Sequence, residues 1–155
     1  MPAADPVAAA FQSMGLTPQF RTFPQGTSTA EQAAEAAGCE VAQIVKSLVF
    51  IADDKVVLLL VSGANRVDES RLAQLADAPV RMATAKEVEE RTGFRIGVVP
   101  PVGHTDELRV FLDRDLMLYP VVWAASGVHN RIFPIAPVLL SAAAGATIVD
   151  LKAGS

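Results

Sequence analysis

Lys46 is the residue whose surroundings most strongly suggest chemistry. It lies in the run Ile-Val-Lys-Ser-Leu-Val-Phe at residues 44–50, where its neighbours are otherwise residues that form a protein core. A buried ammonium group is costly unless it has a partner or an anionic ligand. A lysine at the mouth of a pocket is therefore a candidate for binding a phosphate or a hydroxyl group. The alternative is that its stem packs against the core while its charged head reaches water.

A second candidate is the segment 97–103, which reads Gly-Val-Val-Pro-Pro-Val-Gly. Its prolines remove backbone donors and its glycines permit positive φ, so the sequence predicts an irregular loop. A loop braced by proline can hold backbone amides and carbonyls at fixed positions toward a small ligand. The same composition is also typical of a tight surface connection.

The histidines and the cysteine do not complete a known catalytic set. His104 directly follows the loop and His129 lies in an expected turn, and neither has a carboxylate partner by spacing. No Gly-x-Ser-x-Gly nucleophile motif is present. Cys39 is the only cysteine, which excludes an internal disulfide and does not suit a zinc site. The sequence predicts chemistry without metal or cofactor, and a conventional esterase that uses His104 is the weaker alternative.

Three further positions follow expected strands. Asn65 follows an expected strand, after a short Ser-Gly connection, and could line the mouth of the same pocket. The nearby Asp68 is more simply a helix cap. Ser126 and Gly127 follow a late strand and supply either a backbone contact or a turn.

Periodicity, capping residues and turn residues predict the elements that must position these candidates. The expected helices cover 7–14, Ser28 to Gly38 with a Ser28/Glu31 capping box, a segment capped by Asp68, a segment from the Thr84/Glu87 capping box to Gly93, and 137–142. The expected strands are 19–23, a hairpin of 46–52 and 56–61, 80–82, 108–112, 121–125, 131–133 and 147–149.

Length and charge limit the classes of protein. A chain of 155 residues predicts one domain, 1–155, with one core. The net charge of −4 argues against a protein that holds long nucleic acid by charge alone, but a tRNA 3′ end is short enough to remain compatible. The first ten residues have no basic region, and the longest apolar run, 56–61, is too short to span a bilayer. We therefore expect a cytoplasmic protein.

In their order and spacing, these features resemble the YbaK / prolyl-tRNA-synthetase-associated family of editing domains. The features are Lys46 at a strand entrance, Gly97-x-x-x-Pro101 with Gly103-His104, and Ser126-Gly127 after a late strand. The resemblance covers the chain from about Thr29 to its end. It implies an α/β fold with a YbaK-like mixed, strongly curved β-sheet, which forms a partial barrel flanked by helices.

The resemblance also implies a function. The chain would be a trans-editing hydrolase, an aminoacyl-tRNA deacylase, that removes Ala, Ser, Thr, Cys or 2-aminobutyrate from mischarged tRNA. Lys46 would orient the terminal adenosine, and the loop would hold the amino acid while a positioned water and a tRNA hydroxyl carry out hydrolysis. The implied substrate-binding residues are Asn65, Gly97, Val98, Val99, Pro100, Pro101, Gly103, His104, Ser126 and Gly127.

The implied partners are the acceptor end of an aminoacylated tRNA and an aminoacyl-tRNA synthetase, with no DNA, membrane or metal. Val98, Val99 and Pro100 make the loop more apolar than the family pattern, which leaves the identity of the amino acid open. A second hypothesis is a non-catalytic binder of an aminoacyl-tRNA 3′ end or of a nucleotide-like ligand that acts as a partner of a synthetase.

Overall fold

The computed structural model describes residues 5–106 and 108–154. Its helices are α1 Pro6–Ser13, α2 Ala30–Ala37, α3 Glu69–Ala76, α4 Ala85–Thr92 and α5 Pro137–Ala144, with 3-10 helices η1 Val41–Gln43 and η2 Arg114–Leu118. Its strands are β1 Arg21–Thr22, β2 Val45–Ala52, β3 Lys55–Ser62, β4 Val80–Met82, β5 Arg109–Asp113, β6 Val122–Ala125, β7 Arg131–Ile135 and β8 Thr147–Val149.

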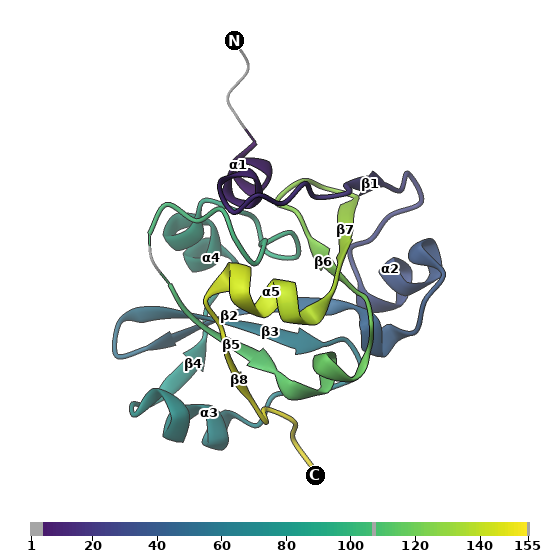
Figure 1. The fold of residues 1–155 in the computed structure, drawn as a ribbon. Coiled ribbons are helices and arrows are strands. Elements are labelled where there is room, and N and C mark those ends of the chain that lie inside the picture. Colours follow the sequence, from purple (N-terminus) through teal and green to yellow (C-terminus); the bar gives the residue numbers. More distant parts are fainter. Residues whose placement is uncertain (1–4, 107, 155) are drawn as a thin grey trace.

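The strands form two open sheets (Figure 1). The larger sheet has the order β4-β2-β3-β5-β8, with β4, β2 and β3 antiparallel and β3, β5 and β8 parallel. The smaller sheet, β1-β7-β6, is antiparallel. A parallel bridge between Ile44 and Trp123 joins the two sheets. The predicted mixed α/β fold with flanking helices is confirmed, and its strands are divided between two sheets.

Both faces of the large sheet are covered, which explains why its central strand, β3, contains the unbroken apolar run 56–61. Side chains alternate along β3, so that Leu58 and Leu60 enter one core and Leu59 enters the other. The first core lies toward α1, α4, α5 and the small sheet, and the second lies under α3, where Leu72 is fully buried (Figure 1). The sheet is therefore a central layer with the small sheet packed on one side.

Local signals explain most of the element boundaries. The β2–β3 hairpin turns at Asp53 and Asp54, whose φ values of 51° and 62° fit a type I′ turn. Asp68 caps α3, and α4 opens with the predicted Thr84/Glu87 capping box.

None of the helices in the described ranges is long and apolar enough to cross a membrane.

One predicted capping box is wrong by a single residue. The segment 28–32 reads Ser-Thr-Ala-Glu-Gln, which contains two overlapping capping patterns. The structure uses Thr29 and Gln32: the Thr29 hydroxyl accepts the Gln32 amide at 3.1 Å, and the Gln32 side chain accepts the Thr29 amide at 3.3 Å. Spacing alone cannot choose between two overlapping boxes.

Other differences concern lengths. The first strand contains only Arg21 and Thr22, α5 continues to Ala144, and the 3-10 helix η2 was not predicted. Pairing with β7 limits β1, because a strand that short is defined by its partner and not by its own sequence.

Candidate functional site

A pocket of about 290 Å³ lies where the two sheets meet. Its volume lies just below the range of roughly 300–1,000 Å³ that is usual for sites that bind drug-sized ligands. Four parts of the chain line it: the segment before α2 with the first turns of α2, the start of β2, the loop after α4, and the small sheet with its β6–β7 turn. The lining residues are Thr27, Ser28, Thr29, Ala30, Ala33, Ile44, Val45, Lys46, Ser47, Leu48, Ile96, Gly97, Val98, Trp123, Ala125, Val128, Arg131 and Ile132.

Lys46 supplies a cation to this pocket. Its Nζ donates a hydrogen bond to the backbone carbonyl of Asn65 at 2.6 Å, and its side chain is half-buried. Burial lowers the pKa of Lys46, Glu31 and Asp113 oppose that shift, and Arg66 adds to it. An ammonium has three donors, so a group held by one carbonyl keeps donors for a ligand.

The backbone carbonyl of Asn65 accepts the hydrogen bond from Lys46, whereas the Asn65 side chain faces away from Lys46. The side chain is buried and donates to the carboxylates of Asp113 and Asp115, at 2.8 Å in each case. Asn65 does not line the pocket. The structure therefore brings Asn65 to Lys46 but not to the pocket interior.

The predicted loop divides between the pocket and the core. Gly97 and Val98 line the pocket, and Gly97 has a φ of 91°, in the region that favours glycine. Val99, Pro100 and Pro101 are buried. The Val98 and Val99 side chains thus have different surroundings although they are neighbours.

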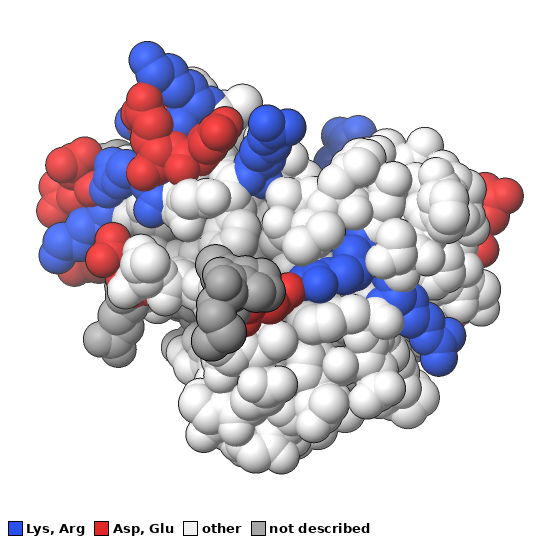
Figure 2. Space-filling model, turned by 90° about the horizontal axis from the view of Figure 1, so that it is seen from above, with Lys and Arg blue, Asp and Glu red and all other residues white. Residues whose placement is uncertain are grey.

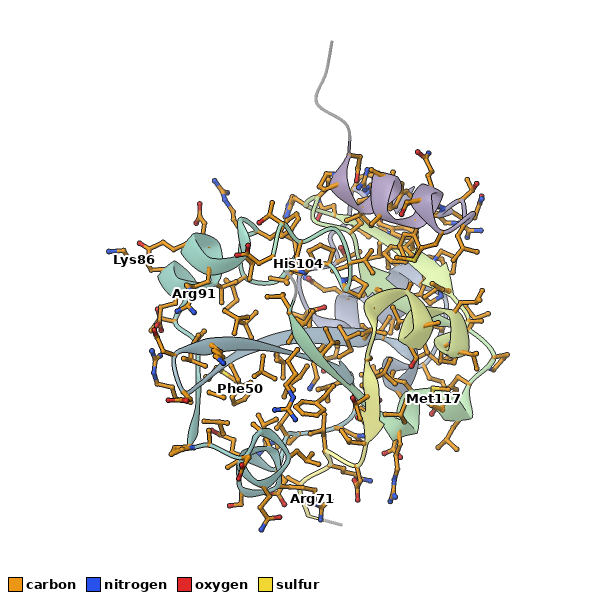
Figure 3. The ribbon with its side chains drawn as sticks, turned by 60° about the vertical axis from the view of Figure 1, so that its left-hand side comes forward. Phe50, Arg71, Lys86, Arg91, His104 and Met117 are labelled. Carbon is orange, nitrogen blue, oxygen red and sulfur yellow. The ribbon has the colours of Figure 1, made fainter. Side chains whose placement is uncertain are left out.

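His104 lies at a different pocket. Together with Pro101 and Gly103 it lines a second pocket of about 240 Å³ beside α5, and Figure 3 shows it between the large sheet and α1. Its Nε2 donates to the Pro100 carbonyl at 2.8 Å, and its ring packs edge-on against Phe94. Burial lowers the pKa of His104, which favours the neutral ring.

Ser126 and Gly127 do not line the pocket, but they form hydrogen bonds with residues that do. The Ser126 hydroxyl donates to the Arg131 carbonyl at 2.7 Å and accepts from Arg131 Nε at 2.8 Å. The Gly127 amide donates to the Val98 carbonyl at 2.9 Å. These contacts fix the Gly97–Val98 segment against the small sheet.

Arg131 was not among the predicted site residues. It lines the pocket, donates to the Asp5 carboxylate at 2.6 Å, and lies 3.8 Å from the centre of the Phe20 ring. Burial would raise the pKa of Asp5, but hydrogen bonds from Arg131 and the α1 amides outweigh it and lower that pKa. A lone cation that precedes the apolar run 132–136 was the available signal, the same kind of signal that identified Lys46.

Trp123 and Ser47 were also missed. Trp123 is the only tryptophan in the sequence, and the guanidinium of Arg21 lies 5.4 Å from its ring centre. The Ser47 hydroxyl is buried and has no hydrogen-bond partner among the described residues. Its position directly after Lys46 was the only sequence signal. Within the described ranges, no group of three or more His, Cys, Asp or Glu side chains is placed to hold a metal ion.

Comparison with known proteins decides the family. The model of the aminoacyl-tRNA editing domain matches residues 24–142. The chain belongs to this family. This editing domain is 35% identical over 120 residues to the uncharacterised protein YwhH of Bacillus subtilis, with 77% of this chain and 76% of YwhH aligned. The resemblance seen in the sequence is confirmed.

Two further comparisons connect the editing domain with prolyl-tRNA synthetases. It is 33% identical over 117 residues to the proline–tRNA ligase of Bacillus subtilis, which covers 74% of this chain and 20% of the ligase. A crystal structure of a proposed trans-editing enzyme for prolyl-tRNA synthetase superimposes with a TM-score of 0.92 at 46% identity, covering 99% of each chain. The fold of the editing domain is thus shared over nearly its whole length.

Proposed function

We propose that this editing domain is a trans-acting aminoacyl-tRNA deacylase that hydrolyses the ester of tRNA mischarged with a small amino acid. The position of the Lys46 ammonium is the observation that carries the proposal. Its half-buried ammonium lines the pocket, and the Asn65 carbonyl at 2.6 Å orients it without neutralising it. Such a group can bind the phosphate or the ribose hydroxyls of a tRNA 3′ end.

The lining of the pocket supports a small amino acid. Val98, Ile132 and Trp123 provide an apolar surface in a pocket of about 290 Å³, which suits a small apolar side chain. We expect alanine and 2-aminobutyrate to be released fastest. Serine, threonine and cysteine stay in the panel, since one methylene changes discrimination by only ~1–3 kcal/mol.

Hydrolysis in this site would depend on positioning. A water adds to the ester carbonyl carbon, the bond from that carbon to the ribose oxygen breaks, one proton of the water passes to that oxygen, and the other proton is released to solvent. The amino acid leaves with a carboxylate and the tRNA with a free hydroxyl. The Gly97 backbone and the Lys46 ammonium are the groups available to orient the ester and the water.

The test uses tRNAs mischarged with each amino acid of the panel. We expect release by the wild-type protein and a loss of about 100-fold or more in Lys46→Ala, the size typical for removal of a preorganised charge-stabilising group. Lys55→Ala is the matched control, because Lys55 is exposed at the opposite end of the same hairpin. Release should be unchanged in that variant.

Two outcomes would contradict the proposal. Wild-type release by a folded Lys46→Ala variant would remove Lys46 from the mechanism. Binding of charged tRNA by the wild type without any release would instead favour the non-catalytic binder of an aminoacylated 3′ end.

A further inference from the structure

Asp113 is a fully buried carboxylate at the end of β5. Its Oδ2 accepts the Ser62 amide at 3.1 Å and the Asn65 side-chain amide at 2.8 Å, and its Oδ1 accepts the Asp115 amide at 3.1 Å. No ion pair within the described residues includes Asp113. Burying a carboxylate without a cation is costly, so its three N–H donors must compensate for lost hydration.

Sheet topology places this carboxylate beside the turn that follows β3. Strands β3 and β5 are parallel, and Leu60 pairs with Leu112, so Ser62 and Asp113 lie at the same edge of the sheet. The Asn65 amide donates to the Ser62 carbonyl at 2.9 Å, which closes a turn. Asp113 binds both ends of that turn, through the Ser62 backbone and the Asn65 side chain.

The same turn presents the carbonyl that receives Lys46. A chain of two hydrogen bonds therefore runs from the Asp113 carboxylate through Asn65 to the Lys46 ammonium, at 2.8 Å and 2.6 Å. The charged groups that act on Lys46 are Glu31 and Asp113, which are opposite in sign, and Arg66, which is like in sign. Asp113 thus acts on Lys46 both through the turn and through its charge.

We infer that Asp113 is a positioning residue for Lys46, because it fixes the Ser62–Asn65 turn whose carbonyl orients the ammonium in the pocket. The consequence for turnover rests on the proposed deacylase function, whereas the consequence for Lys46 itself does not.

The test compares Asp113→Asn with Asp115→Asn. Both carboxylates accept from Asn65 at 2.8 Å, but only Asp113 also binds the Ser62 amide. Titration of Lys46 followed by NMR should show a lower pKa in Asp113→Asn, because an attracting charge is lost, and an unchanged one in Asp115→Asn. We also expect kcat for deacylation to fall by about tenfold to 100-fold in Asp113→Asn, because Lys46 would be displaced, with the alkaline limb of its pH profile moved to lower pH.

The outcomes separate the inference from the proposed function. Wild-type titration of Lys46 together with wild-type kcat in Asp113→Asn would overturn the inference. Absence of deacylation by the wild-type protein would overturn the proposed function alone, since the NMR titration still tests the positioning. If Asp113→Asn does not fold, Asn65→Ala breaks the same chain while keeping the backbone carbonyl, and an unchanged Lys46 titration there would overturn the inference.

Discussion

Two half-buried basic side chains, Lys46 and His104, line different pockets. Lys46 is bound by one carbonyl and keeps donors for a ligand. His104 donates its Nε2 proton to the Pro100 carbonyl, and its Nδ1 is buried without a partner among the described residues. The histidine therefore supports the loop, and a hydrolytic role for it would require access to the pocket that contains Lys46.

The environment of His104 predicts how stability depends on pH. Burial lowers its folded-state pKa below the ordinary value of 6.5, so the unfolded state binds more protons between these two values. The stabilisation that comes from the neutral, buried His104 ring is complete above about pH 6.5, and it is lost as the pH falls toward the folded-state pKa of His104. The free energy of unfolding, measured with denaturant, should therefore decrease from about pH 7.5 to about pH 5.5.

Replacement of the imidazole tests this assignment. His104→Gln should flatten the pH dependence, and His129→Gln should leave it unchanged, since His129 is exposed. An equal decrease in His104→Gln and the wild type would assign the pH dependence to other groups.

At the scale of secondary-structure elements, the turn between β6 and β7 is fixed to the loop after α4 by a hydrogen bond and by close packing. The Gly127 amide binds the Val98 carbonyl at 2.9 Å, and Gly127 packs so closely on Phe94 that a Cβ there would lie 2.8 Å from the ring. The φ of 82° at Gly127 adds a backbone requirement for glycine. This close approach sets the separation of the two segments at the pocket.

Gly127→Ala should destabilise the protein by more than backbone strain alone. We expect a loss of about 1–2 kcal/mol from the left-handed backbone and a further loss from displacement of the Phe94 ring. Gly93→Ala is the matched control, because its φ is 80° and nothing lies within 4 Å of an added Cβ. Equal losses of unfolding free energy in the two variants would show that the Phe94 contact is not required.

The sequence predicts elements whose signals are local. The Asp53-Asp54 turn, the Thr84/Glu87 capping box and the strand at 80–82 each depend on residues within a few positions, and the structure contains all three. The division into two sheets is different, because β1 pairs with β7 across more than a hundred residues. No local pattern encodes such a pairing.

The same distinction applies to the candidate site. Lys46, Gly97 and Val98 could be singled out as a buried cation and an irregular loop, and the structure places them around one pocket. Spacing could not tell that Val99 faces the core, because an irregular loop has no periodicity. It also could not connect Arg131 with Asp5, which lies 126 positions away.

At the scale of the whole molecule, charge is unevenly distributed. Figure 2 shows charged side chains gathered over part of the face seen from above, beside a broad area without Lys, Arg, Asp or Glu. Helices α1 and α5 contain no charged residue, and the chain has a net charge of −4. An RNA ligand would therefore be held by few phosphate contacts close to the pocket.

The salt dependence of tRNA binding should be shallow. If Lys46 and Arg66 are the cations that contact a single-stranded 3′ end, log K should fall with log salt with a slope of about −1.4, and Lys46→Ala should reduce the steepness by about 0.7. Binding is measured by fluorescence titration over about 50–200 mM salt. A slope steeper than about −4 would reveal an extended basic RNA surface.

The pocket lies across the junction between two sheets that meet at the Ile44–Trp123 bridge. Lys46 belongs to the large sheet, whereas Trp123, Arg131 and Ile132 belong to the small one. If the chain is a deacylase as proposed, Lys46 and part of the apolar lining of the pocket therefore belong to separate hydrogen-bonded frameworks. On that proposal, substitutions in β6 and β7 should change which amino acid fits while the β2–β3 ladder around Lys46 keeps its register, so the substrate could change without any change at Lys46.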